Sequence, residues 1–466
     1  MALSLDKTLL EDKFSFTGKA KSKIFMLIGA GALLLSIGIF LLINASHGHG
    51  HVEKHEAAAP TVEHVTEHHE HTAADRVAAA EEHATEHHGK PVWLKRIIKD
   101  LWMNNVFFLG ISLIGVFFVA FNYVAHAGWG ALIKRIPEAF GYYLPIGAFL
   151  TILLLILFGH DLFHWMDPSL FQKYLADGKT LNPHFDEVIK SKEWYLTPTF
   201  FWVRTLIYLT LWILFWLKLR TNSQKEDLEG GTKLYFNSID WSAGFLFVLG
   251  ISSSMSAWDW IMSMDPHFFS TMFGWYVFAS WFVSGLATIT LVIIFLKDNG
   301  HLKLVNENHL HDMGKFMFGF SIFWTYVWFE QFLLIYYVNI PEEAYYFVER
   351  LKNPTYRPIF FGTFIINFIF PFLVLMTRNA KRQFIILKIA ATGILIGHWF
   401  DFYMMTTPPM LHNDGGLDFN FLFVEVGMTM IFIGVFCFAI LTGLTKAGLI
   451  AKNHPMIDES IHHHVY

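Results

Sequence analysis

Residues 24–43 read IFMLIGAGALLLSIGIFLLI, an apolar run without a charged residue. A helix rises about 1.5 Å per residue, so roughly 20 apolar residues cross the ~30 Å hydrocarbon core of a bilayer. A strand of a membrane barrel would be about half as long and would alternate polar and apolar residues, which this run does not do. The stretch therefore predicts a membrane-spanning α-helix.

The same pattern recurs along the chain. Overall, 54% of the 466 residues are hydrophobic and only 16% are charged, far from the averages of soluble proteins. The sequence therefore predicts an all-α polytopic membrane protein with about ten transmembrane helices in two bundles. Only the short turn Asp265-Pro266-His267 divides the fifth span from the sixth. After the first span, we predict spans at residues 106–125, 140–158, 198–217, 243–262, 271–296, 316–340, 358–376, 384–405 and 421–441.

Loop charges predict the orientation, because cytoplasmic loops carry an excess of Lys and Arg. With the N-terminus inside, cytoplasmic segments hold Lys134 and Arg135, then Arg378, Lys381 and Arg382, and further lysines. The outer turns 265–270 and 406–420 have no Lys or Arg, although the outer loops 160–197 and 341–357 have several. The balance predicts both termini in the cytoplasm. Residues 1–23 then form a cytoplasmic segment without a cleavable signal peptide, residues 106–443 a nine-helix core, and residues 444–466 a cytoplasmic tail.

Two unusual segments lie between the first two spans. Residues 44–90 are rich in His, Glu, Ala and Thr and cannot build a core. We interpret this segment as a flexible periplasmic insertion; the alternative is transition-metal binding by clustered imidazoles such as His68, His69 and His71. In residues 91–105, apolar residues occupy one helical face, and Lys95, Arg96, Lys99 and Asp100 occupy the other. That pattern predicts an interfacial amphipathic helix lying on the bilayer or against a partner.

This chain offers few residues that could bind a redox cofactor. The single cysteine, Cys437, cannot hold an iron–sulfur cluster, which needs several thiolates. A b-type haem would need two facing histidines within spans, and His398 is the only histidine clearly inside one. We therefore expect no metal site and no redox cofactor bound by this chain alone, and no nucleic-acid partner.

Charged groups inside a membrane are costly and usually functional, so their depth is informative. Under the predicted topology, most of the ionisable groups fall toward the periplasmic leaflet. Only Lys388 and Asp240 lie on the cytoplasmic side. We therefore expect proton chemistry near the outer leaflet. The span candidates for proton handling are Arg204, Asp259, Tyr326, Glu330, Lys388, His398, Asp401 and Glu425. The nearby outer loops hold further ionisable groups at His160, Asp161, His164, Asp265 and His267.

The spacing of these residues suggests pairs but leaves alternatives open. His398 and Asp401 are three residues apart, hence on one helical face, and could relay protons or form a structural pair. Tyr326 and Glu330 begin a stripe that continues to Tyr337 and could be a proton path or a packing stripe. Arg204 could neutralise a buried acid. Asp259 and Glu425, near the headgroups, could instead face water.

Four stretches resemble a known family. They are residues 160–168 (HDLFHWMDP), 253–276 (SSMSAWDWIMSMDPHFFSTMFGWY), 326–346 (YVWFEQFLLIYYVNIPEEAYY) and 398–409 (HWFDFYMMTTPP). With ten spans and a preceding His-rich insertion, the chain resembles the F-type membrane subunit of bacterial alternative complex III, which is related to polysulfide-reductase-like membrane subunits. The resemblance covers the chain except residues 46–90.

The resemblance implies a subunit of a quinol:electron acceptor oxidoreductase in a bacterial inner membrane. Quinol, such as menaquinol, is oxidised near the periplasmic leaflet, and electrons pass to haem c and iron–sulfur clusters in partner subunits. The implied partners are a related C-type membrane subunit, an iron–sulfur subunit, multihaem and monohaem cytochromes c, a terminal oxidase and lipids. The resemblance also implies that Asp259, Asp265, His398 and Asp401 are the polar positions of the family motifs. It places His160, Asp161, His164 and His267 near them in a quinone region.

Two other functions remain open from the sequence. The chain could be a non-catalytic scaffold that holds the redox subunits, with its polar groups as structural pairs. It could also be an ion-coupled transporter, which would call for internal repeats and broken helices carrying a midplane site; we find no clear repeat.

Overall fold

The computed structural model describes residues 10–48, 90–175, 179–412 and 416–465. Every regular element in these ranges is helical, apart from one isolated bridge between Tyr174 and Leu181. Ten helices in the described part of the chain are long and apolar enough to cross a membrane. The all-α, polytopic fold expected from the apolar runs is therefore confirmed, and the multi-pass membrane protein follows from it.

Most of the predicted spans correspond to longer helices. The third span is α4 and α5 with a 3₁₀ turn between them, and the eighth is α12 and α13 joined by a π-helical turn at Ile365–Ile369. The fifth and sixth spans are separate, as expected, because a 3₁₀ turn at Met262–Met264 ends the first of them. The spanning helices are α1 (Gly18–Gly48), α3 (Val92–Val124), α4 (Arg135–Phe140), α5 (Leu144–Leu162), α7 (Pro198–Glu229), α8 (Lys233–Trp260), α9 (Phe273–Asp298), α10 (Glu307–Val338), α12 (Arg357–Phe364), α13 (Phe370–Val374), α14 (Phe384–Thr406) and α16 (Glu425–Leu444).

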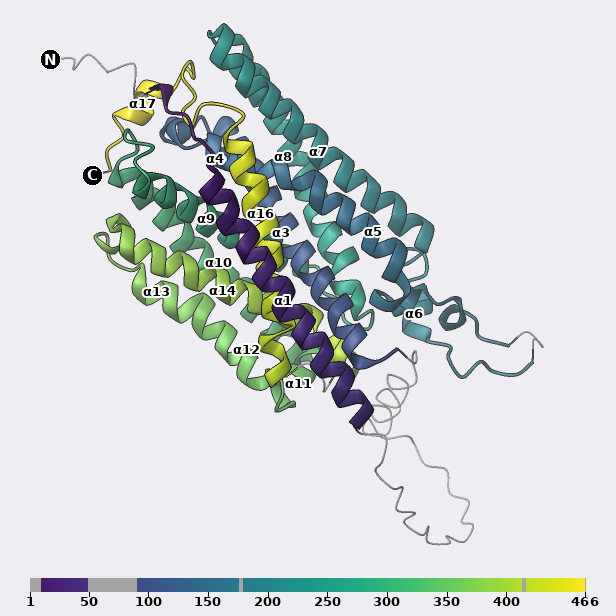
Figure 1. Ribbon diagram of the computed structural model, residues 1–466. Helices are drawn as coiled ribbons and strands as arrows, with labels where there is room; N and C mark the ends of the chain where they lie inside the picture. The colour runs from purple at the N-terminus through teal and green to yellow at the C-terminus, as the bar shows by residue number, and fades with distance from the viewer. Residues whose placement is uncertain (1–9, 49–89, 176–178, 413–415, 466) are drawn as a thin grey trace, which may run out of the picture.

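Helix α3 is the centre of the molecule. It packs against α4, α5, α8, α9, α14 and α16, and most of its residues are buried. Figure 1 shows α5, α7 and α8 on one side of it and α9, α10, α12, α13 and α14 on the other. Short helices α6 (Glu187–Ser191), α11 (Pro341–Lys352), α15 (Pro408–Leu411) and α17 (Ile457–Ile461) cap the ends.

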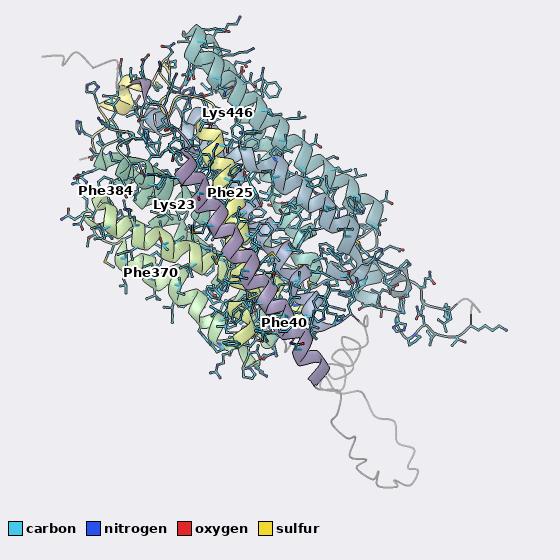
Figure 2. The ribbon with its side chains drawn as sticks, in the orientation of Figure 1. Lys23, Phe25, Phe40, Phe370, Phe384 and Lys446 are labelled. Atoms are coloured by element: carbon cyan, nitrogen blue, oxygen red, sulfur yellow. The ribbon has the colours of Figure 1, made fainter. Side chains whose placement is uncertain are left out.

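The start of α1 and the C-terminal helix α17 lie at the same end of the bundle (Figure 1). We call this the terminal end, and the opposite end, with α6 and α11, the distal end. In Figure 2, Lys23 and Lys446 lie toward the terminal end and Phe40 lies toward the distal end. Both ends of the chain lie at one end of the bundle because the number of crossings is even, as the predicted topology requires. The assignment of this end to the cytoplasm stays a prediction.

Helix α1 lies on the outside of the bundle and packs on α16 (Figure 1). Glycines allow the two backbones to approach: a Cβ atom on Gly31 would lie 2.7 Å from the carbonyl oxygen of Gly427. Small residues at such crossings are typical of membrane helix pairs, where close packing replaces the hydrophobic effect. Gly31 and Gly427 therefore attach the first helix to the last span.

Residues 91–105 do not form a separate interfacial helix, so that prediction is wrong. They are the first part of α3, and the nine-helix core begins at Val92 rather than at residue 106. The polar face turns inward, with Arg96, Lys99 and Asp100 at most 2% exposed. The reason is that Glu425 of α16 and Asp418 just before it offer acidic partners on that side. The His-rich segment, including His68, His69 and His71, lies outside the described residues except at its ends.

Candidate functional site

Asp401 is the centre of a buried polar cluster in the distal half of α14. Its carboxylate accepts hydrogen bonds from the Tyr276 and Ser280 hydroxyls and, at 2.9 Å, from Nε1 of Trp324. Tyr276 and Ser280 are four residues apart on α9 and therefore share a face. Three donors occupy most of the lone pairs of a carboxylate. The protein thus supplies the solvation that the bilayer cannot.

His398 lies one turn before Asp401 and is fully buried. Its Nδ1 is 3.7 Å from Oδ2 of Asp401, beyond hydrogen-bond distance. The ring packs edge-on against Trp324, with centroids 5.4 Å apart. Within the described residues, neither ring nitrogen has a hydrogen-bond partner. The imidazole therefore stands beside the carboxylate with both nitrogens available.

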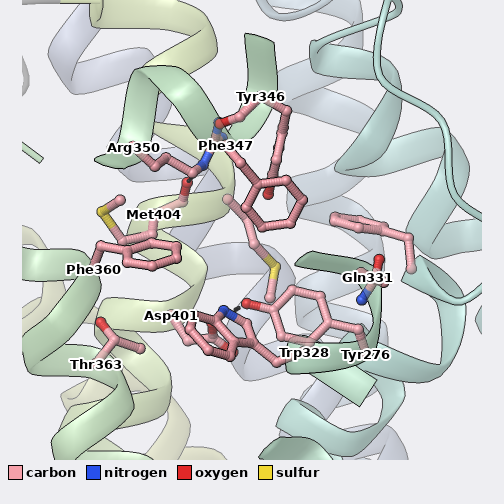
Figure 3. A pocket seen from close by; sticks show the side chains of 12 residues that line it. Tyr276, Trp328, Gln331, Tyr346, Phe347, Arg350, Phe360, Thr363, Asp401 and Met404 are labelled. Carbon is pink, nitrogen blue, oxygen red and sulfur yellow. Dashed lines mark hydrogen bonds between the residues drawn. The ribbon is translucent and has the colours of Figure 1, made fainter. Parts of the chain in front are cut away.

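A narrow hollow opens beside Asp401, between α9, α10, α11, α12 and α14 (Figure 3). The free space inside it is about 20 Å³, room for about one water molecule, so a larger ligand requires its lining side chains to move. Figure 3 shows Tyr276 and Asp401 on one side of it and Arg350 and Tyr346 on another. Half of its lining residues are aromatic, among them Trp328, Phe347 and Phe360, and Met404 and Met405 complete the apolar walls.

Arg350, on α11, supplies a cation to this hollow. It is 2% exposed, and its Nε and Nη1 donate to the backbone oxygens of Met404 and Tyr346 at 3.0 and 2.7 Å. Its Nη2 lies buried without a hydrogen-bond partner among the described residues. The guanidinium lies 3.4 Å from the centre of the Tyr346 ring. The hollow therefore has an unused donor at Arg350 and an acceptor at Asp401.

The distal loops hold α11 in place. The Tyr346 ring stacks on Phe268 with centroids 4.0 Å apart, and burial raises the pKa of Tyr346 to about 12, which keeps the phenol protonated. Asp265, which begins the loop that contains Phe268, is half-buried. Burial raises the pKa of Asp265, while the nearby charges of Arg350 and His267 act in the opposite direction.

His267 connects this loop to α6. Its Nε2 lies 2.7 Å from Oδ2 of Asp186, which also caps the N-terminus of α6. Burial alone would raise the pKa of Asp186, but the hydrogen bond and charge of His267 outweigh it and hold the pKa at about 2. Burial likewise opposes protonation of His267, and the Asp186 contact outweighs it and raises the pKa. Lys192, which follows α6, donates to the backbone oxygen of Pro266 and so adds a second contact between α6 and the loop of His267.

A second cluster joins α7 to α8. Arg204 forms a two-point ion pair with Asp259, through Nε to Oδ2 at 2.9 Å and Nη2 to Oδ1 at 2.8 Å. The Tyr208 hydroxyl donates to the same carboxylate at 3.2 Å. Arg204 therefore neutralises a buried acid, as the sequence suggested, and Asp259 does not face water because it is fully buried.

A third cluster joins α3 to α16. Arg96 Nε lies 2.5 Å from Oε1 of Glu425, and Arg96 also pairs with Asp418 at 2.8 Å. Lys99 Nζ lies 2.5 Å from Oδ1 of Asp100 and 3.6 Å from Oε1 of Glu425. Glu425 is fully buried, which excludes the alternative that it faces water. Arg96, Lys99 and Asp100 could not be recognised from the sequence as buried, because a helical face of this composition is equally suited to solvent.

The remaining candidates lie away from the Asp401 cluster. His160 is exposed at the end of α5, His164 is half-buried, and Asp161 pairs with Lys90 at 2.7 Å. Lys388 forms an exposed pair with Asp298 at 2.5 Å. On α10, Tyr326 is exposed, and Glu330 one turn later is half-buried at the edge of the same outward face. None of these makes a hydrogen bond to Asp401 within the described residues.

The terminal end also holds buried charge, which contradicts the expected one-sided distribution. Glu138 is 3% exposed and accepts from Arg220 at 2.6 Å, Arg135 at 3.1 Å and Ser223 at 2.5 Å. Lys134 Nζ lies 2.8 Å from Oε2 of Glu226, and both groups are buried. Lys134 and Arg135 were expected to be loop charges, whereas they are buried at the start of α4 beside the end of α7.

Comparison with known proteins adds no relative. No protein-family model matches the chain, and no curated protein matches it.

Proposed function

We propose that this chain is the integral membrane subunit of a quinol-oxidising respiratory complex of the alternative complex III type, and that the hollow beside Asp401 takes the quinol. One observation carries the proposal. The hollow is lined by a buried donor without a partner, Arg350 Nη2, and by a buried carboxylate, Asp401. A hydroquinone presents two oxygens on opposite sides of a flat ring, and this arrangement can address both.

In the proposed reaction, the quinol releases two electrons and two protons and becomes quinone. Arg350 donates a hydrogen bond to one ring oxygen and orients the ring. The hydroxyl of Tyr276, bonded to Asp401, faces the other oxygen, and the proton of that oxygen passes to Asp401 with His398 beside it. The second proton, from the oxygen at Arg350, passes to water at the distal end. General bases within hydrogen-bond reach typically accelerate such a step about 10²–10⁴-fold. The electrons go to iron–sulfur and haem c groups of partner subunits.

The hollow is narrow, so the ring enters with movement of side chains. Met404 and Met405 line it, and methionine is unbranched and adapts to irregular shapes. Side-chain rearrangement on binding is common in sites whose backbone is already formed. In this proposal the distal end lies on the periplasmic side of a bacterial inner membrane. The terminal end, with its basic loops, then faces the cytoplasm.

A non-catalytic scaffold is the second candidate. It is favoured by the Arg204–Asp259 pair, in which the carboxylate is saturated by Arg204 and Tyr208 and has no place left for a substrate. Under that function, substitution of Asp401 would impair assembly before turnover.

The test is purification of the chain through a C-terminal affinity tag in mild detergent, followed by a quinol-reduced minus oxidised spectrum and identification of the co-purifying chains. The proposal predicts cytochrome c bands that quinol reduces, and partner chains that carry haem c and iron–sulfur motifs. A colourless chain that purifies alone under conditions that keep membrane complexes intact would contradict it.

A further inference from the structure

Helix α10 carries a polar stripe on the face that turns away from the bundle. Tyr326, Glu330, Leu333 and Tyr337 follow one another at intervals of four, three and four residues, so they lie on one side of the helix. Tyr326, Leu333 and Tyr337 are 63%, 48% and 86% exposed. The opposite side of α10 packs into the bundle around Trp324, which is fully buried.

Glu330 is the unusual member of this stripe. It lies seven residues before Tyr337, or about 10 Å deeper along the helix axis. Tyrosines are typical of the membrane–water interface, so Glu330 falls inside the apolar layer. Its Oε2 is buried and makes no hydrogen bond among the described residues. A carboxylate at such a depth normally faces a bundle interior and pairs with a donor, because lipid tails offer none.

The outward face of α8 serves as a comparison, because its composition is that expected of a lipid-facing surface. On α8, Phe247 and Ile251 are 72% and 51% exposed and carry no polar group. The stripe on α10 differs from that face in its phenols and its carboxylate. Its spacing of four, three and four residues is also the pattern by which a helix contacts one neighbouring helix, and a single polar residue in such a seam fixes its register.

We propose that Tyr326, Glu330, Leu333 and Tyr337 form the docking seam for one transmembrane helix of a different subunit, which presents a Lys, an Arg or another strong hydrogen-bond donor to Glu330. Charge complementarity selects this occupant. A second copy of the chain that paired α10 with α10 about a twofold axis would bring two Glu330 carboxylates together, and like charges in a low-dielectric layer repel. The proposal goes beyond the quinol function and does not depend on it.

The test uses a photoreactive phenylalanine analogue at Tyr326 or Leu333 in the full complex in native membranes, with Phe247 as the matched exposed control. The proposal predicts cross-links from positions 326 and 333 to one transmembrane helix of another subunit, mapped by mass spectrometry beside a Lys, Arg or amide residue. Position 247 should give lipid adducts.

Substitution of Glu330 completes the test. Glu330→Leu should lower recovery of the cross-linked subunit about tenfold, as expected for loss of one interhelical polar contact. Glu330→Gln, which can still accept a hydrogen bond, should retain more of it, and Phe247→Leu should change nothing. Lipid adducts alone at 326 and 333, cross-links to a second copy of this chain, or full recovery in Glu330→Leu would each overturn the proposal.

Discussion

Arg96 and Glu425 are 329 positions apart in the chain, yet the Nε atom of Arg96 lies 2.5 Å from the Oε1 atom of Glu425 in the buried interior. This pair joins the start of the central helix α3 to the start of the last span, α16. Asp418 and Lys99 extend it, so the distal end of the bundle is closed by charge as well as by apolar packing.

The effects of substituting Arg96 and Glu425 on the free energy of unfolding should be strongly coupled. Glu425→Ala leaves the Arg96 guanidinium buried with only Asp418, and removal of one partner of a buried pair costs about 3–5 kcal/mol. Replacement of both groups, in Arg96→Met with Glu425→Leu, should cost far less than the sum of the single changes. Thermal unfolding of the purified variants in detergent measures this cycle, and additive effects would show that the pair does not form.

The contact between Gly31 and Gly427 should hold α1 on the bundle. A side chain in Gly31→Leu meets the Gly427 carbonyl oxygen, and such overpacking typically costs about 1–3 kcal/mol. With a protease site introduced near residue 65, the cleaved wild-type α1 should stay with the core through purification, while Gly31→Leu should release it. Gly29→Leu is the matched control, because a Cβ at Gly29 meets nothing within 4 Å. Retention of α1 in Gly31→Leu would argue against this packing.

The His267–Asp186 contact should make the distal loops pH-dependent. The pKa of His267 is raised in the folded protein, so its stabilisation is complete below about pH 6.5 and is lost as the pH rises through the raised value. The pKa of Asp186 is lowered to about 2, so its contribution is present above about pH 3.8 and is lost as the pH falls toward 2. Lys192 and Asp265 face the same pair and share its field.

Hydrogen exchange of residues 186–197, corrected for the intrinsic pH dependence of exchange, measures this effect. Protection should be highest between about pH 4 and 6.5 and should decline toward pH 9. His267→Gln should remove the decline above neutrality. An unchanged profile in His267→Gln would mean that another group controls the loop.

Arg350 should act in quinol binding rather than in proton transfer. Loss of a hydrogen bond from a charged donor costs about 1.5–3 kcal/mol, so Arg350→Gln should raise the KM for quinol roughly 10–100-fold with a smaller change in kcat. Lys352→Gln, an exposed residue on the same helix, is the control. Steady-state quinol oxidation by the purified complex decides the matter. A fall in kcat at unchanged KM would place Arg350 in the chemical step instead.

The apolar runs predicted the spans well because about twenty uncharged residues have few alternatives to a membrane helix. The depth of Asp401 and its neighbour His398 followed from the same counting. The donors to Asp401 could not be predicted, since Tyr276 and Ser280 come from a helix more than a hundred positions earlier. Periodicity within one helix says nothing about which distant helix faces it.

The errors have a common physical cause. Arg96, Lys99 and Asp100 form a polar helical face, and such a face is equally suited to water or to a buried set of opposite charges. Lys134 and Arg135 obey the loop-charge rule and still lie buried beside Glu226 and Glu138. Arg350 was counted as an outer-loop charge, although α11 folds it back over the hollow. Sequence position predicts the end of the bundle at which these residues lie, but their burial depends on partners that the fold brings together.

Asp401 should accept a proton of quinol oxidation, and the most direct measurement of this role is single-turnover quinol oxidation by the purified complex carrying Asp401→Asn. Asn preserves the shape but has no carboxylate, so the rate should fall about 10²–10⁴-fold while subunit composition and haem spectrum stay as in the wild type. Asp240→Asn, at an exposed position of the terminal end, should oxidise quinol at the wild-type rate. A fully assembled Asp401→Asn complex that oxidises quinol and releases protons at the wild-type rate would contradict the claim.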